Sequence, residues 1–181
     1  HAAQRDLHEP GDLAVTRLPA ALVALLAAAG PLLADPPSVD HQPVPCTVPD
    51  QPFTLCATVT DDGEVARARI YFKPENAKFY SFVDMVFSGI EFCGTLPAPR
   101  EGKLKTIEYY VQAVDDAYET FRTSTHVIAV QPDGVCGFAP VEKDASRTQS
   151  ITVHATHQKQ GRKLPDAFAS AGVTFVPIQG R

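Results

Sequence analysis

Alternating apolar and polar positions run through the middle of the chain, and they are clearest between Ile107 and Val130. In the first half of this stretch, every second position is held by Ile107, Tyr109, Val111 and Ala113. The positions between them are held by Glu108, Tyr110, Gln112 and Val114. A period of two residues is typical of a strand with one buried face. Asp115 and Asp116 interrupt the alternation, and a second run ends at Val130. The stretch therefore predicts a hairpin.

Five further short runs upstream have strand character and are separated by turn residues. They cover residues 44–48, 53–60, 65–72, 79–87 and 90–96. Between the second and the third, Asp62-Gly63 is a strong hairpin signal. Seven short strands within about 95 residues, with no helical period, predict an all-β fold, a seven-stranded immunoglobulin-like sandwich of two sheets.

Several strings in this region resemble the Ig-like and fibronectin type III-like modules of secreted bacterial proteins. They read TLCATVTDDGEVARARIYF, FVDM, GTLPAP and IEYYVQAVDDAYE. The resemblance covers residues 44–130 and matches Tyr109 to an inward-facing tyrosine of the sixth strand. The chain has no tryptophan, whereas many fibronectin-type modules have one in the core. The resemblance thus implies the Ig-like fold more strongly than the narrower family, and a fold by itself implies no activity.

The chain before the predicted sandwich has the pattern of an export signal. Arg17 precedes an apolar run, Leu18 to Ala34, that ends before Asp35. A secretory signal peptide typically has a positively charged residue, then an apolar stretch, then small residues at the cleavage site. We therefore assign residues 1–34 to a signal peptide. The acidic residues before Arg17 are unusual in such a signal and are interpreted as lying upstream of its natural start. A membrane anchor is the alternative, but about 17 residues broken by Gly-Pro is short for a bilayer.

Three segments follow the predicted signal. Residues 35–43 are proline-rich and are predicted to be an extended linker. Residues 44–137 are assigned to the sandwich, and residues 138–181 to a short C-terminal extension that pairs with the sandwich or lies across it. The start of a second domain, cut off at Arg181, is the alternative for the last segment.

Four cysteines follow the signal, and an even number in an exported chain predicts disulfides. They are Cys46, Cys56, Cys93 and Cys136, which allow three pairings. A zinc site is the competing use, but no C-x-x-C pair is present. In the Ig-like arrangement the second and fifth strands are antiparallel neighbours, which implies a Cys56–Cys93 bridge. Cys46 and Cys136 would then join the two ends of the domain.

Charge and motif content argue against two classes of function. The net charge is -5 and the 16 basic residues are scattered, so we expect no nucleic-acid partner. The sequence has no G-x-S-x-G, H-E-x-x-H or P-loop motif, and we expect no enzyme and no catalytic residue. His154 and His157 are three residues apart, which on a strand places them on opposite faces and prevents a shared metal.

Six acidic residues fall in two predicted turns that meet at one pole of an Ig-like sandwich. They are Asp61, Asp62, Glu64, Asp115, Asp116 and Glu119. Calcium prefers carboxylate and carbonyl oxygens, so this pole is a candidate calcium site, and no other cofactor is expected. The alternative is that these residues only form turns, because no D-x-D-x-D-G loop is present.

Four aromatic residues share the outward parity of strands that can lie in one sheet. They are Tyr71, Tyr80, Phe82 and Tyr110. Such a patch suits sugar rings or a protein partner. The alternative is that the C-terminal extension covers the patch with Phe168, Val173 and Phe175.

Together these observations favour a non-catalytic Ig-like binding or structural module, secreted or periplasmic and acting at the cell envelope. The alternative is a carbohydrate-binding or calcium-dependent adhesion module. A protein or a cell-wall glycan is the expected partner, and no transmembrane span is expected after signal cleavage.

Overall fold

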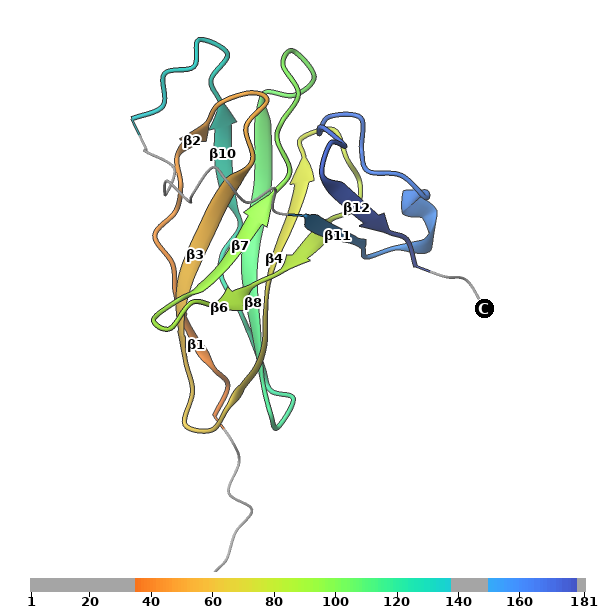
Figure 1. Cartoon of the computed structure of the whole chain (residues 1–181). Coiled ribbons are helices and arrows are strands. Elements are labelled where there is room, and N and C mark those ends of the chain that lie inside the picture. Colours follow the sequence, from red (N-terminus) through yellow and green to blue (C-terminus); the bar gives the residue numbers. More distant parts are fainter. Residues whose placement is uncertain (1–34, 138–149, 179–181) are drawn as a thin grey trace, which may run out of the picture. The chain divides into compact units, whose positions relative to one another are not determined.

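Two β-sheets form the part of the chain that the structure, a computed structural model, describes, namely residues 35–137 and 150–178 (Figure 1). The signal peptide predicted at residues 1–34 lies outside these ranges. Within them the one helical element is η2, a 3-10 turn at Gln158–Gln160. No helix in the two described ranges is long and apolar enough to cross a membrane. The described chain is all-β, as the alternating pattern predicted.

The smaller sheet has four strands in the order β1-β3-β7-β6, all paired antiparallel. Their bounds are Ser38–Asp40 for β1, Phe53–Thr60 for β3, Val86–Phe87 for β6 and Phe92–Leu96 for β7. β3 has the bounds that the sequence predicted. β1 lies inside the segment expected to be a linker, so this part of the linker is a strand instead. Its Val39 pairs with Val59 and packs against the core, which explains the difference.

The larger sheet has eight strands and contains the longest pairing. Its order is β12-β11-β5-β4-β8-β10-β2, with β9 also paired to β8. The bounds are Cys46–Thr47 for β2, Val65–Pro74 for β4, Ser81–Asp84 for β5, Thr106–Asp115 for β8, Thr120–Arg122 for β9, His126–Val130 for β10, Ile151–Ala155 for β11 and Val173–Val176 for β12. β4 and β8 run antiparallel along almost their whole length.

Twelve strands in the described ranges replace the predicted seven, partly because two predicted strands are each divided. The run at 79–87 becomes β5 in the larger sheet and β6 in the smaller one. Between them the backbone N–H of Met85 still donates to the carbonyl of Ala68 on β4, 2.9 Å away. The last run divides into β9 and β10, both of which pair with β8. Local alternation does not reveal such breaks, because each half keeps the two-residue period.

Alternation directs every second side chain into the space between the sheets. Fully buried residues there include Leu55 of β3, Ile70 and Phe72 of β4, and Tyr109 and Val111 of β8. Burying one such side chain stabilises the fold by about 1.5–3 kcal/mol. Gly94 of β7 faces the same space, where a Cβ would lie 2.7 Å from Ile70 Cδ1. A larger residue at this position would therefore displace the Ile70 side chain.

The C-terminal extension completes the edge of the larger sheet (Figure 1, blue). β11 pairs antiparallel with β5, and β12 pairs parallel with β11. Between these two strands the chain inserts Phe168, which is 2 % exposed and meets the ring of Phe72 at 5.4 Å between centroids. Residues 150–178 therefore extend the sheet and the core of the sandwich.

Candidate functional site

Two disulfides cross-link the domain in the pairs expected from the sequence. Cys56 on β3 and Cys93 on β7 are directly opposed, with Cα atoms 4.1 Å apart. Cys46 on β2 is joined to Cys136, with Cα atoms 5.8 Å apart and 90 residues between them in sequence. The first bridge holds neighbouring strands together, and the second ties the start of the domain to the segment after β10.

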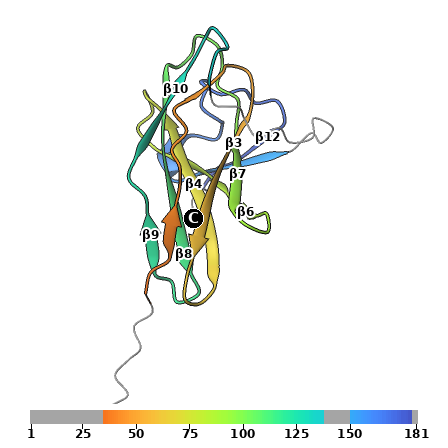
Figure 2. The same ribbon diagram turned by 90° about the vertical axis from the view of Figure 1, so that its left-hand side faces the viewer.

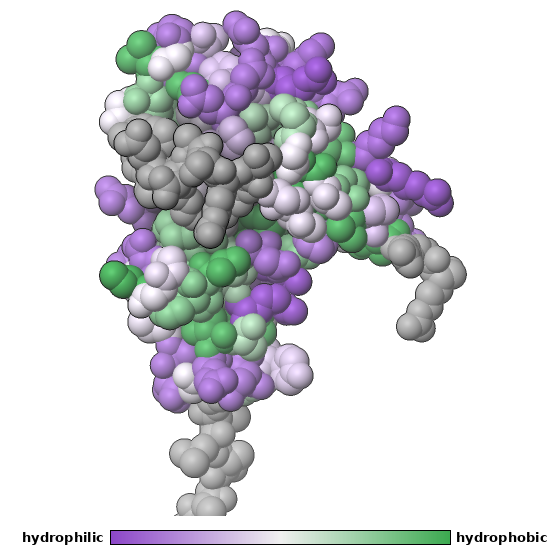
Figure 3. Space-filling model, viewed as in Figure 1, coloured by the Kyte–Doolittle hydropathy of each residue, from purple (hydrophilic) through white to green (hydrophobic). Residues whose placement is uncertain are grey.

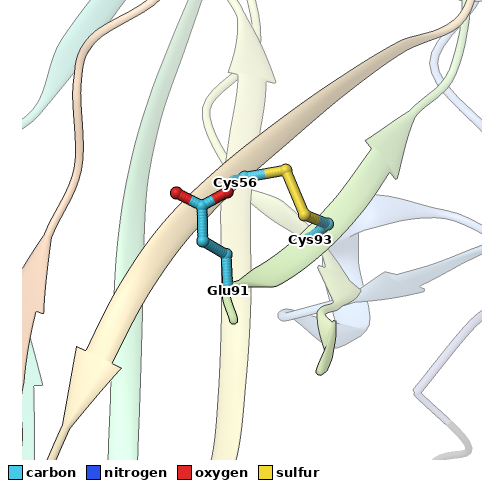
Figure 4. Close-up of side chains that lie close together, drawn as sticks. All are labelled: Cys56, Glu91 and Cys93. Carbon is cyan, nitrogen blue, oxygen red and sulfur yellow. A yellow bond between two sulfur atoms is a disulfide. The ribbon is translucent and has the colours of Figure 1, made fainter. Parts of the chain in front are cut away.

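Cys56, Glu91 and Cys93 are the one group of three metal-ligating residue types that converges among the described residues (Figure 4). The two sulfur atoms are bonded to each other, so neither is available as a thiolate ligand. The group is a structural disulfide beside an exposed glutamate.

The outer face of the larger sheet carries a row of rings, one from each of four neighbouring strands. Tyr71 on β4 is directly opposite Phe82 on β5 and Tyr110 on β8, and Phe82 is opposite His154 on β11. We call these four residues the aromatic row. Three of them were predicted from parity, and His154 joins them because β11 extends the sheet.

Stacking between the rings determines which parts of the aromatic row face solvent. Tyr71 and Tyr110 stack with centroids 4.8 Å apart and planes 8° apart. Phe82 and His154 stack in the same way at 4.7 Å. Tyr80, the fourth predicted aromatic residue, meets Tyr110 edge-on at 5.1 Å and donates its hydroxyl to Glu108. The rings thus pack face to face, and the hydroxyls of Tyr71 and Tyr110 have no hydrogen-bond partner within the described residues.

Cationic side chains lie over the aromatic row. The guanidinium carbon of Arg122 is 3.7 Å from the ring centroid of Tyr110, and that of Arg69 is 4.0 Å from the centroid of Phe82. Arg69 also forms an ion pair with Asp84 at 2.7 Å. Arg122 donates to the hydroxyl oxygen of Thr125 and has no carboxylate partner in the described part of the chain. Its charge therefore remains available beside the rings.

Burial is the largest influence on the pKa of Tyr110 and raises it, while the nearby charge of Arg122 lowers it by a smaller amount. The net shift is upward, so the phenol remains protonated at neutral pH and offers a hydroxyl as both donor and acceptor.

The C-terminal extension does not cover the aromatic row with the three residues considered for that role. Phe168, Val173 and Phe175 all belong to or pack against the core cluster between the sheets. His157, beyond β11, stacks on Phe79 at 4.1 Å, whereas His154 stacks within the row. The two histidines thus contact different rings.

The six acidic residues of the candidate calcium site belong to the β3–β4 loop and to the end of β8 with the β8–β9 loop, and the two loops lie at the same end of the sandwich, the lower end in Figures 1 and 2. The loops are joined by a hydrogen bond from the N–H of Asp116 to the carbonyl of Glu64, 3.0 Å long. No three acidic residues of the described chain converge with oxygens within 4.8 Å of one another. The structure therefore brings the two loops together without forming a compact cluster of carboxylates.

A half-buried histidine, His41, connects the two sheets. His41 Nδ1 lies 2.7 Å from the carbonyl oxygen of Cys56, and its Nε2 lies 2.7 Å from the hydroxyl of Tyr109. A carbonyl only accepts, so Nδ1 carries the proton and Nε2 accepts from the tyrosine. The Tyr109 oxygen in turn accepts the N–H of Val44 at 3.2 Å. Each polar atom is satisfied, which is typical of a structural role.

Sequence reasoning missed Arg122, His154 and His41 as members of these clusters. The position of Arg122 could have been predicted, because Arg122 falls in the second strand of the predicted hairpin and Tyr110 lies on the first. For His41 no signal existed, since its partners are 15 and 68 residues away.

Comparisons with known proteins add little to this geometry. No protein-family model matches the chain, and no curated protein matches it. An engineered protein of known structure aligns with a TM-score of 0.42 and 14% identity, over 55% of this chain and 21% of that one. The SrpA adhesin from Streptococcus sanguinis aligns at 0.38 and 17%, over 67% and 71% of the two chains. A point mutant of that adhesin aligns at 0.36 and 15%, over 64% and 69%. The site is therefore interpreted from the residues of this chain.

Proposed function

We propose that this chain is a non-catalytic, exported module with an Ig-like sandwich, and that it binds a cell-surface glycan on the outer face of its larger sheet. The two disulfides support export, because such bonds persist in oxidising compartments. Support for the Ig-like topology comes from the bridge between β3 and β7 and from an N-terminal segment whose strands β1 and β2 pair with different sheets.

The aromatic row with Arg122 above it is the observation that carries the proposal. Stacking occupies one face of each ring in the row, and guanidinium groups lie over Phe82 and Tyr110, so little aromatic face is left on which a sugar ring can stack. The row instead offers the hydroxyls of Tyr71 and Tyr110 and the N–H groups of Arg122. These groups suit a ligand rich in hydroxyls, and a guanidinium pairs well with a carboxylate or sulfate.

Charge on this face favours an acidic glycan. The outward positions of β4, β5, β8 and β9 carry four cationic side chains and two carboxylates, namely Arg67, Arg69, Lys73 and Arg122 against Asp84 and Glu108. The whole chain has a net charge of -5. A locally positive surface on an acidic protein steers anionic ligands to that surface.

The test is binding of the full chain to an array of neutral and acidic glycans, followed by calorimetry with the strongest binder. We expect Arg122→Gln to weaken binding about 10-fold or more, because a charge-assisted hydrogen bond is lost. Tyr71→Phe and Tyr110→Phe retain the stacked rings and should each weaken it about 2- to 10-fold by removing a hydroxyl.

Arg162→Gln is the matched control, because Arg162 is an exposed arginine of the loop between β11 and β12. It should bind like the parent chain. Unchanged affinity in Arg122→Gln, or an array with no acidic binder, would show that the aromatic row serves only to cover the sheet.

A protein partner is a second candidate, favoured by a different surface. The β6–β7 hairpin exposes three large apolar residues, with Val86 71 % exposed, Phe87 57 % and Ile90 83 %. Figure 3 shows hydrophobic surface in this region of the smaller sheet. Exposed aromatic and aliphatic side chains of this kind are common at protein interfaces. Ile90→Ser together with Phe87→Ser should abolish binding to a protein partner and leave glycan binding unchanged.

A further inference from the structure

A cleft opens where the chain after β5 separates from β11. β11 pairs with β5 at two positions, and the pair nearer the cleft joins His154 to Phe82, where the ladder ends. After Asp84 the chain turns away from β11 and forms β6 in the smaller sheet. The space between β11 and the β6–β7 hairpin is a cleft of about 640 Å³. Ligand sites in proteins commonly have volumes of about 300–1,000 Å³.

Backbone groups from both sides point into this cleft. The N–H of Ile151 donates to the carbonyl of Gly172, just before β12, at 2.9 Å. Successive residues of a strand direct their N–H and C=O groups to opposite edges, so those of Thr152 point away from β12 and into the cleft. On the other side, the N–H of Met85 donates to a carbonyl of β4, so the backbone groups of Asp84 also face the cleft. Two strand edges therefore border it.

The lining of the cleft lacks the residues that usually block the addition of a strand. Natural sheet edges are protected by Lys, by Pro or by a covering segment. None of the described residues that line the cleft is Lys, Arg or Pro. β6 is the last strand of the smaller sheet, and its Val86 and Phe87 expose their side chains beside the cleft. The edge is therefore open to a further strand.

Asp84 gives the cleft a negative charge. It is the one acidic residue among the described residues of the lining, and its side chain is 50 % exposed. Its Oδ1 accepts from Arg69 Nε at 2.7 Å, whereas Oδ2 lies 3.7 Å from His154 Nε2, beyond hydrogen-bond distance. A cationic side chain that enters the cleft would therefore find Oδ2 available as an acceptor.

We propose that the cleft binds an extended segment of a partner protein, which pairs with the edge of β11 at Thr152 and places a Lys or Arg against Asp84. An extended backbone offers N–H and C=O groups at the spacing of such an edge, and its alternate side chains provide specificity. Side chains on one face of the added strand would contact Val86 and Phe87, so apolar residues should alternate along it. The inference specifies the protein partner considered above and rests on that candidate function.

The test begins with selection on the full chain from a phage library of random peptides of about nine residues. We expect the selected peptides to alternate apolar residues and to carry a Lys or Arg. The strongest is then synthesised, and its dissociation constant is measured by fluorescence anisotropy. N-methylation of every second amide, in at least one of the two possible phases, should weaken binding about 10-fold or more, because it removes backbone donors.

Thr152→Pro should weaken binding of the same peptide about 10-fold or more, because it removes the N–H that faces the cleft. Thr152→Val is the matched control, since it keeps this N–H and removes only the hydroxyl, and it should bind like the parent chain. Asp84→Asn should reduce the preference for the Lys or Arg peptide over its Gln counterpart about 10-fold.

Two results would overturn strand addition and leave a protein partner on the β6–β7 hairpin possible. One is equal affinity for the parent peptide and both N-methylated forms, which also decides the question if Thr152→Pro fails to fold. The other is unchanged affinity in folded Thr152→Pro together with loss of binding in the Phe87→Ser, Ile90→Ser variant. A selection that enriches no peptide would reject the inference outright. A dimer of the parent chain that is absent in Thr152→Pro, measured by light scattering, would assign the cleft to a second copy instead. Glycan binding is measured separately, so none of these results bears on it.

Discussion

The two sheets of this sandwich stabilise their outer faces by different means. On the smaller sheet, Cys56 and Cys93 are bonded across β3 and β7, and the hydroxyls of Thr54 and Thr95 meet at 3.0 Å two residues away. On the larger sheet the same outward positions hold stacked rings with guanidinium groups above them. One face depends on a covalent bond, and the other on side-chain packing.

Strand length explains the difference. The edge strands of the smaller sheet have three residues in β1 and two in β6, so they contribute few backbone hydrogen bonds. The central strands of the larger sheet, β4 and β8, each have ten residues and pair along most of them. A short ladder specifies register weakly, and a disulfide between directly opposed residues fixes it. A long ladder fixes its register without such a bond.

The largest expected effect is the loss of a disulfide. A Cys56→Ala, Cys93→Ala double variant should lose about 4 kcal/mol of unfolding free energy, from the entropy of opening a loop of this length. The same change at Cys46 and Cys136 should cost between about 4 and 5 kcal/mol, because that loop is longer. Urea denaturation of both double variants measures the two costs. A loss below about 1 kcal/mol at Cys56 and Cys93 would show that the smaller sheet is held by packing, like the larger one.

The next effect concerns packing between the sheets. Gly94→Ala should cost about 1–3 kcal/mol, since the new methyl group would lie 2.7 Å from Ile70 Cδ1 and the core around Ile70 would have to repack. Gly137→Ala is the control, because no atom lies within 4 Å of its Cβ position. The free energy of unfolding in urea is the measurement. Equal stability of the two variants would mean that Ile70 moves aside without cost.

The smallest effect is a dependence on pH at the link between the sheets. Burial lowers the pKa of His41 below its ordinary 6.5, and the carbonyl of Cys56 opposes this shift only in part. The folded state therefore favours neutral His41. Its stability should be constant above about pH 6.5 and decrease as the pH falls below that value, because the unfolded chain binds the proton more tightly.

Thermal melts between pH 8 and pH 5 test this expectation. The His41→Gln variant lacks the titrating ring, so its melting temperature should fall less over this interval than that of the parent chain. Parallel curves for the two proteins would assign the pH dependence to other groups.

The strand pattern was predictable because it depends on the backbone alone. Phe53–Thr60 was predicted with its observed bounds, since its turn residues and its alternation agree. Inward Tyr109 and outward Tyr71, Phe82 and Tyr110 follow from the same parity. The glycan assignment of the outward aromatic residues and the calcium assignment of the acidic residues remain predictions, because parity places a side chain on a face and does not identify its ligand.

Other features depend on contacts that the local sequence does not encode. The break at Met85 between β5 and β6, the pairing of β1 with β3, and the addition of β11 beside β5 each join segments that are distant in sequence. His154 enters the aromatic row only through that last pairing.

The sequence by itself determined the all-β character and the face on which each side chain lies, because a two-residue period is a property of extended backbone. Only the tertiary structure decided which strand neighbours which, that the rings stack face to face, and that a cleft opens between β11 and the β6–β7 hairpin. Those features depend on the register between strands, which is set by hydrogen bonds and packing across the whole domain.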